Sequence, residues 1–217
     1  MISPVSVLCQ CGYQLVVETT GTKPLKDTEC PNCHTPIWFV APLADVVGVR
    51  IMNRAWAELA KEDFTLTIVL SAMAIECELA RQYGKWKGID LSIAQNINVF
   101  QAQRNPQWAK EWREFQTTSR RLDEISKLLT CKTFDSFLSS NSDLSKVIAA
   151  EFPGISGCSS AKKFFIQELF HRRNRILHGG EVDFNELEAR ACFGLAAALF
   201  RIKTTMDLHR NDVLASQ

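Results

Sequence analysis

The sequence predicts a mainly α protein, a helical bundle over residues 43–217 that follows a small N-terminal β ribbon over residues 1–42. Three observations lead to this prediction. Apolar residues recur at helical spacing after Pro42, short β-prone runs alternate with turn residues before it, and four cysteines form two close pairs near the N-terminus. A chain of 217 residues with 46% hydrophobic residues can build one or two globular domains.

The ribbon is predicted from three β-prone runs and from the spacing of its cysteines. The runs cover residues 5–7, 13–17 and 36–40. Two close cysteine pairs on two turns let four thiolates meet tetrahedrally around one Zn²⁺. A unit of this size cannot hold a core alone, so the metal should supply its folding energy. We therefore predict one structural zinc ion, held by Cys9, Cys11, Cys30 and Cys33.

Other interpretations of the cysteines stay open. They could form disulfides or remain free thiols, and His34 could replace one of them as a ligand. A catalytic zinc is disfavoured because four protein ligands leave no open coordination position. The ribbon carries a net charge of −1 before metal binding, which disfavours phosphate binding and favours contact with a partner protein or with the helical domain.

The helices after Pro42 are predicted from apolar spacing and from residues that start and stop helices. We expect residues 85–105 to be mostly loop with some helix. Ser159 or Ser160 can cap a long helix that ends at His178 before a glycine pair, and Asp183 with Glu186 forms a potential capping box. The expected helices cover residues 43–61, 64–83, 106–115, 119–130, 133–139, 143–152, 160–178 and 183–208.

Charge and hydropathy limit the class of protein. The net charge is only +1, but residues 159–178 hold five basic residues and one acidic residue. The start of the chain does not resemble a secretory signal, and no apolar run is long enough to span a membrane. We therefore expect a cytoplasmic protein with no membrane partner, in which the four isolated cysteines are reduced and buried: Cys77, Cys131, Cys158 and Cys192.

The predicted helix over residues 160–178 ends in Arg173-Asn174-Arg175-Ile-Leu-His178-Gly. This run resembles the Arg-x(4–6)-His signature of HEPN domains (higher eukaryotes and prokaryotes nucleotide-binding). The early apolar helix that carries Glu76 and Glu78 is also similar to that family, and the resemblance covers roughly residues 43–210.

The resemblance implies a four- to five-helix bundle that pairs as a homodimer. It also implies a metal-independent endoribonuclease of a defence or toxin–antitoxin system, with RNA as substrate and an antitoxin or another protein as a possible partner. The implied catalytic residues are Arg173, His178, Asn174 and Glu76.

The chemistry of these residue types agrees with that implication. Cleavage of RNA through the ribose 2′-OH needs a proton-transfer group that works near neutral pH, for which His178 is suited. It also needs positive charge at the phosphate, which Arg173 supplies. Residues five apart lie about 140° apart on a helix, so the cleft should be broad. Glu76 would orient Arg173, and Glu78 is the less favoured residue for that role.

Three alternatives remain from the sequence alone. Arg and His residues in a last turn also stabilise a helix end without any catalytic role. His171, Arg175 and His178 form a single stripe, so His171 could replace Arg173 as the essential residue. The chain could instead be a non-catalytic nucleic-acid or protein-binding adaptor with the same fold. Trp108 and Trp112, four residues apart, are expected to pack on the bundle rather than stack on bases.

Overall fold

The computed structural model describes residues 3–8, 14–19, 32, 34 and 47–215. Near the N-terminus, strands β1 (Ser3–Leu8) and β2 (Gln14–Thr19) pair in antiparallel register from Ser3 opposite Thr19 to Leu8 opposite Gln14. They coincide with the first two runs expected to be strands. The third run, the four N-terminal cysteines and the boundary at residues 42 and 43 lie outside the described residues.

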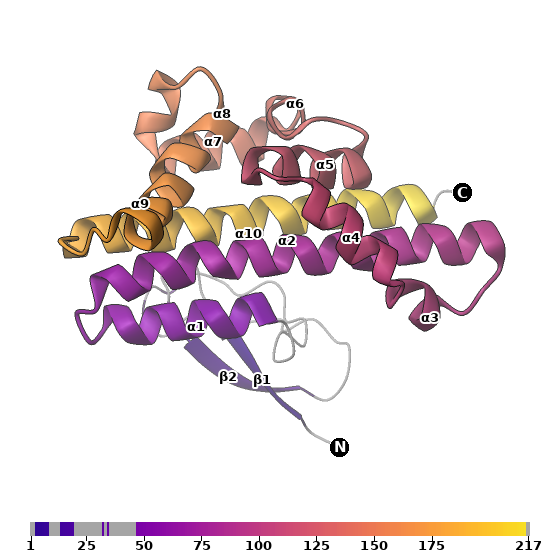
Figure 1. The fold of residues 1–217 in the computed structure, drawn as a ribbon, viewed down its shortest axis with the longest axis horizontal. Helices are drawn as coiled ribbons and strands as arrows, with labels where there is room; N and C mark the ends of the chain where they lie inside the picture. The colour runs from indigo at the N-terminus through magenta and orange to yellow at the C-terminus, as the bar shows by residue number, and fades with distance from the viewer. Residues whose placement is uncertain (1–2, 9–13, 20–31, 33, 35–46, 216–217) are drawn as a thin grey trace.

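Two long helices form the centre of the bundle, as Figure 1 shows. They are α2 (Phe64–Gln95) and α10 (Glu186–Ala215). They run parallel, because positions 78, 86 and 90 of α2 contact positions 203, 207 and 210 of α10 in the same order. The expectation of a mainly helical bundle is confirmed for the described part of the chain.

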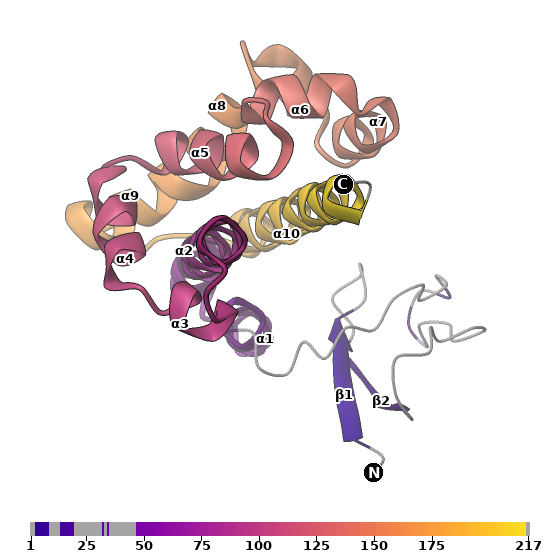
Figure 2. The same cartoon turned by 90° about the vertical axis from the view of Figure 1, so that its right-hand side faces the viewer.

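The other helices cover opposite sides of this central pair. Helix α1 (Val47–Leu59) lies on one side, and the segment from α5 to α9 lies on the other (Figure 2). Apolar side chains from both sides meet the central helices in one buried core. The remaining elements, in chain order, are α3 (Val99–Gln103), α4 (Pro106–Glu114), α5 (Thr118–Thr130), α6 (Phe134–Ser140), α7 (Ser142–Glu151), a 3₁₀ turn (Pro153–Gly157), α8 (Ala161–Phe165), a π-helical turn (Ile166–His171) and α9 (Arg172–Gly179).

Helix α2 is longer than the sequence pattern suggests. The prediction that residues 85–105 are mostly loop is wrong, because α2 continues to Gln95 and α3 follows. Two packing contacts explain the difference. Trp86 is fully buried, and Gly88 allows α3 to approach so closely that an added Cβ would lie 2.5 Å from the Gln103 Cα. The glycine therefore serves helix packing rather than ending the helix.

The start of α10 also differs from the prediction. Asn185 and Glu188 form the capping box: each backbone N–H donates to the other side chain, at 3.2 and 3.0 Å. The box expected at Asp183 and Glu186 is therefore wrong by two residues. Helix α10 continues to Ala215 rather than Leu208. No helix within the described residues is long and apolar enough to cross a membrane.

The isolated cysteines differ in burial. Cys192 is buried, and burial raises its pKa to about 11, so it behaves as a small apolar side chain. Cys77 and Cys158 are half-buried. The expectation is wrong for Cys131, which is exposed and ends α5 with a left-handed backbone at φ 58°.

Candidate functional site

The helix that carries the Arg-x4-His run begins and ends where local signals predict. The Ser160 side chain accepts a hydrogen bond from the Lys163 N–H, so Ser160 is the N-cap. Gly180 ends the helix in the left-handed conformation at φ 66°. The predicted helix over residues 160–178 is thus confirmed as a continuous run of α8, the π-helical turn and α9.

The π-helical turn over Ile166–His171 lies directly before this run. Leu169 and Phe170 within the turn are buried and anchor it to the core. An extra residue in a helical turn rotates everything that follows, and such turns occur often at functional sites. The turn therefore sets which face of α9 is directed toward α2. The sequence pattern gave no signal for it.

The structure brings Arg173 and Glu76 together from α9 and α2. The Arg173 Nη2 donates to the Glu76 Oε1, and the Thr118 hydroxyl donates to the same oxygen at 3.2 Å. The two charged side chains are only 16% and 22% exposed, so water screens this ion pair weakly. The pairing is the one expected from the sequence, whereas the Thr118 contact was not anticipated.

One donor of the Arg173 guanidinium, the Nε atom, takes no part in the pairing with Glu76. This Nε is buried and has no hydrogen-bond partner within the described part of the chain. A buried donor without a partner is destabilising, and a ligand oxygen that reached it would gain a charge-assisted hydrogen bond. Because the Nε atom is buried, a ligand would reach it only after the side chains around it moved.

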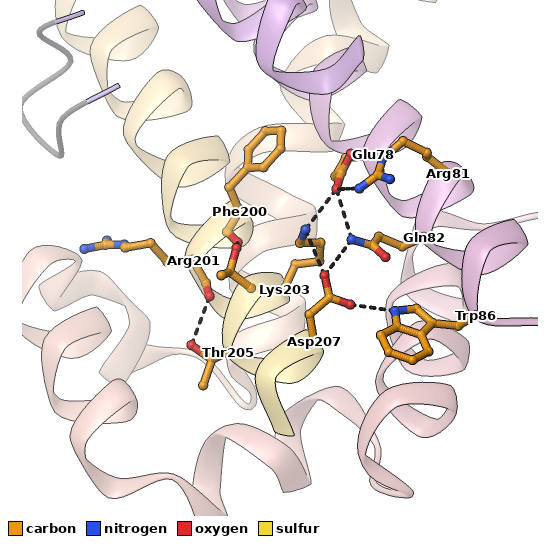
Figure 3. A network of polar contacts seen from close by, with 10 residues as sticks. Glu78, Arg81, Gln82, Trp86, Phe200, Arg201, Lys203, Thr205 and Asp207 are labelled. Carbon is orange, nitrogen blue, oxygen red and sulfur yellow. Dashed lines mark hydrogen bonds and ion pairs between the residues drawn. The ribbon is translucent and has the colours of Figure 1, made fainter. Parts of the chain in front are cut away.

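Glu78 takes part in a different network, on another face of α2 (Figure 3). Its carboxylate accepts hydrogen bonds from Arg81 at 2.7 and 2.8 Å and from Lys203 of α10 at 2.9 Å. Asp207 extends the network by accepting from Gln82 and Trp86. The Glu78 carboxylate therefore joins α2 to α10. Glu76, not Glu78, is the residue that pairs with Arg173.

His178 and Asn174 lie in the last turns of α9, and both are exposed. Within the described residues, the His178 imidazole has no hydrogen-bond partner. Leu177 beside it is 52% exposed. Within one chain, Arg173 thus points toward α2 while His178 faces outward, as an angle of about 140° between positions five apart requires.

The alternative stripe of His171, Arg175 and His178 is exposed along its whole length. Its arginine is already engaged, because the Arg175 guanidinium pairs with Glu181 and lies 5.8 Å from the centre of the Phe184 ring. The stripe therefore presents two histidines and a neutralised arginine.

The positive charge of residues 159–178 is largely compensated. Of its five basic residues, only Lys163 lacks an acidic partner within the described part of the chain. The other four pair with acidic residues as Lys162–Asp123, Arg172–Glu168, Arg173–Glu76 and Arg175–Glu181. This segment is therefore less positive toward a ligand than its composition suggests.

The predicted zinc ligands Cys9, Cys11, Cys30 and Cys33 lie outside the described residues. The residues that the structure does describe contain no cluster of side chains able to hold a metal ion. His34, the alternative ligand, is described as an exposed residue with a left-handed backbone at φ 56°.

No protein-family model, curated protein or solved structure matches this chain.

Proposed function

We propose that this chain is a metal-independent endoribonuclease of the HEPN type. The observation that carries the proposal is the Arg173–Glu76 pair, which holds a partly buried guanidinium with an unpaired Nε five residues before an exposed histidine. In this proposal Arg173 stabilises the phosphate charge, His178 transfers protons, and Asn174 and Glu76 support them.

The reaction needs no metal ion. The ribose 2′-oxygen loses its proton and attacks the adjacent phosphorus, the bond to the 5′-oxygen breaks, and that oxygen takes up a proton. The products are a 2′,3′-cyclic phosphate and a 5′-hydroxyl. Two His178 side chains, one from each copy of a homodimer, would provide one base and one acid. Leu177, next to His178 in the chain, and Val182 and Leu187, which follow α9, are exposed and offer apolar surface for this pairing.

The test is cleavage of bulk RNA and tRNA by the purified protein in the presence of EDTA. His178→Ala should lower the rate about 10²–10⁴-fold, as expected for loss of a general acid–base group. His171→Ala is the matched control, because His171 is an exposed histidine on the same helical run and should leave the rate unchanged. DNA and RNA methylated at the 2′-OH should be inert, and activity per chain should fall on dilution if two copies build the site.

Equal cleavage by the His178→Ala variant and the parent would end the nuclease proposal. If His171→Ala is the inactive variant instead, the stripe of His171, Arg175 and His178 replaces the assignment of Arg173.

A second function has an observation in its favour. Four of the five basic residues around the motif are already neutralised by acidic partners, Arg173 among them. A paired arginine is less able to stabilise the charge that develops during cleavage, so the pairing favours a HEPN-like adaptor that binds nucleic acid or protein without cleaving it. RNA binding without cleavage, unaffected by His178→Ala, would favour the adaptor. A neighbouring antitoxin or phage-defence gene would favour the nuclease and an antitoxin as partner.

We also propose the N-terminal zinc ribbon as a separate structural unit, with Cys9, Cys11, Cys30 and Cys33 as its ligands. The pairing of β1 with β2 supports this proposal, because the first cysteine pair falls between these two strands in the sequence.

A further inference from the structure

A second candidate ligand site lies away from α9, between α2, α3 and α4. It is a groove of about 750 Å³ beside the C-terminal half of α2, where Figure 1 shows α3 and α4. Its volume falls within the range typical of ligand sites. None of the described residues that line it is acidic, and the side chains that matter here are Arg81, Lys85, Arg104, Trp108 and Arg113.

Arg81 is paired with Glu78, but the other three cations of this groove differ from those around α9 in having no acidic partner in the part of the chain that the structure describes. Within the described residues, neither Lys85, Arg104 nor Arg113 has a carboxylate at ion-pair distance. The Lys85 ammonium lies 4.6 Å from the centre of the Trp86 ring instead, and burial lowers its pKa. Arg113 donates its Nε to a backbone oxygen of its own helix. A positive charge left without a partner in a concave site attracts an anion.

Neither acidic residue of α4, Glu111 or Glu114, lines the groove. Glu111 accepts a hydrogen bond from the Tyr83 hydroxyl at 2.8 Å and another from Gln107 at 2.8 Å. Neither Glu111 nor Gln107 lines the groove. Of the two basic residues of α4, Arg113 lines the groove and Lys110 does not.

Trp108 adds an aromatic surface to the groove wall. Its indole N–H donates to the Ala102 oxygen at 2.7 Å, which fixes the ring between α3 and α4 while leaving the side chain half-exposed. Basic grooves with a fixed aromatic ring are typical of sites for single-stranded nucleic acid, where phosphates meet the cations and a base stacks on the ring.

We propose that this groove binds a single-stranded RNA segment through its phosphodiester backbone. The identity of the polyanion as RNA rests on the proposed function; the binding of a phosphate chain rests on the groove alone. Arg81 and Lys85 lie five and nine residues after Glu76 on α2, about 8 and 14 Å farther along the helix axis. They also lie about 140° and 180° around the helix axis from Glu76, so a strand bound in the groove would have to pass around the helix to reach the Arg173–Glu76 pair.

Gly84 allows a direct test inside the groove. It lines the cavity, and a Cβ added there would meet no atom within 4 Å. Gly84→Glu places a negative charge in the groove, and Gly84→Gln places a neutral side chain of the same shape. Both replace a helical glycine with a better helix former, so neither should impair folding.

Binding is measured with the full chain carrying His178→Ala, so that cleavage cannot interfere. The probe is a fluorescein-labelled oligouridylate, followed by anisotropy between about 50 and 200 mM salt. We expect Arg104→Ala with Arg113→Ala to weaken binding about tenfold and to reduce the salt slope by roughly 1.4, for two lost phosphate contacts. Gly84→Glu should weaken binding more than Gly84→Gln. The control Lys132→Ala with Lys146→Ala removes the same charge from exposed positions elsewhere and should change neither quantity.

The proposal is overturned if the groove variants bind RNA as the parent does, if the control pair weakens binding equally, or if the parent binds no RNA. It is also overturned if uridine monophosphate or inorganic phosphate displaces the oligonucleotide at micromolar concentration, since the site would then take a small phosphate ligand. Failure of the nuclease proposal gives a different result. The parent would then not cleave RNA, while RNA binding would remain and would still depend on the groove residues.

Discussion

At the scale of single residues, the environment of Arg173 differs sharply from that of His178. The first is held by Glu76, which is itself fixed by Thr118, and retains an unpaired Nε. The second is exposed at the helix end. A guanidinium held in place before the ligand arrives loses little entropy on binding, while an exposed imidazole remains free to transfer protons.

Glu76→Gln tests whether Glu76 positions Arg173. The amide removes the negative partner but keeps the shape, so the guanidinium becomes less ordered and its charge is no longer neutralised. We expect the cleavage rate constant to fall about tenfold while RNA binding tightens at low salt, a combination that simple destabilisation does not produce. Single-turnover kinetics and anisotropy measure the two effects. Glu186→Gln, in an exposed ion pair, is the control. Unchanged rate and affinity would show that Glu76 has no such role.

At the scale of elements, glycines on α1 and α2 show how close packing overrides local propensity. Gly48 and Gly88 mark places where α1 meets α2 and α3 meets α2, since an added Cβ would lie 2.8 Å from the Ala74 oxygen and 2.5 Å from the Gln103 Cα. Gly84, which lies on α2 like Gly88, faces open space. The same residue type is therefore required at two positions and replaceable at a third.

Gly84→Ala and Gly88→Ala should change stability in opposite directions. Alanine at position 84 has space and improves helix propensity, so the free energy of unfolding should rise by about 0.5–1 kcal/mol. Alanine at position 88 would force α3 away, so the free energy of unfolding should fall by about 1–3 kcal/mol. Urea denaturation measures both. The close approach of α3 would be refuted by equal stabilisation in the two variants.

At the scale of the whole molecule, the buried Glu78 network joins the two central helices (Figure 3). Burial by itself raises the pKa of Glu78, but hydrogen bonds and charge from Arg81 and Lys203 outweigh it and lower the pKa below its ordinary value. A lowered folded-state pKa contributes stability that is present above the unfolded pKa and is lost as pH falls through the folded pKa.

The contribution of Glu78 should therefore disappear in acid. At neutral pH, Glu78→Gln should lower the free energy of unfolding by about 2–3 kcal/mol, less than for a fully buried pair because Arg81 is partly exposed. The difference between parent and variant should shrink as pH falls below about 4.5, the ordinary pKa of the group. Glu186→Gln removes an exposed ion pair and should hardly change the free energy of unfolding at any pH. A difference independent of pH would contradict this account.

The proposed ribbon leads to a prediction about zinc binding and about the independent stability of the helical domain. We expect one zinc ion per chain, lost in Cys30→Ser and retained in Cys131→Ser, as measured by elemental analysis. Chelation should leave the far-UV helical signal mostly intact, because residues 47–215 hold a core of their own. Full zinc retention by Cys30→Ser would refute the ligand set.

The sequence by itself determined where several helices start and stop, because caps act over only a few residues. Ser160 bonds the backbone three residues on, Gly180 adopts the left-handed backbone that glycine tolerates, and Pro106 opens α4 as expected. Apolar residues cover most of the circumference of α2, and this pattern likewise predicted its place at the centre of the bundle.

Only the tertiary structure decided the features that depend on contacts across the chain. Glu76 faces Arg173 across 97 residues, Trp86 meets Asp207 across 121, and the basic groove gathers side chains from three helices. The sequence named Glu76 as a candidate partner, but the π-helical turn that rotates Arg173 toward it left no pattern in the residues. Such juxtapositions follow from how helices pack, and packing is set by the whole core rather than by neighbours in sequence.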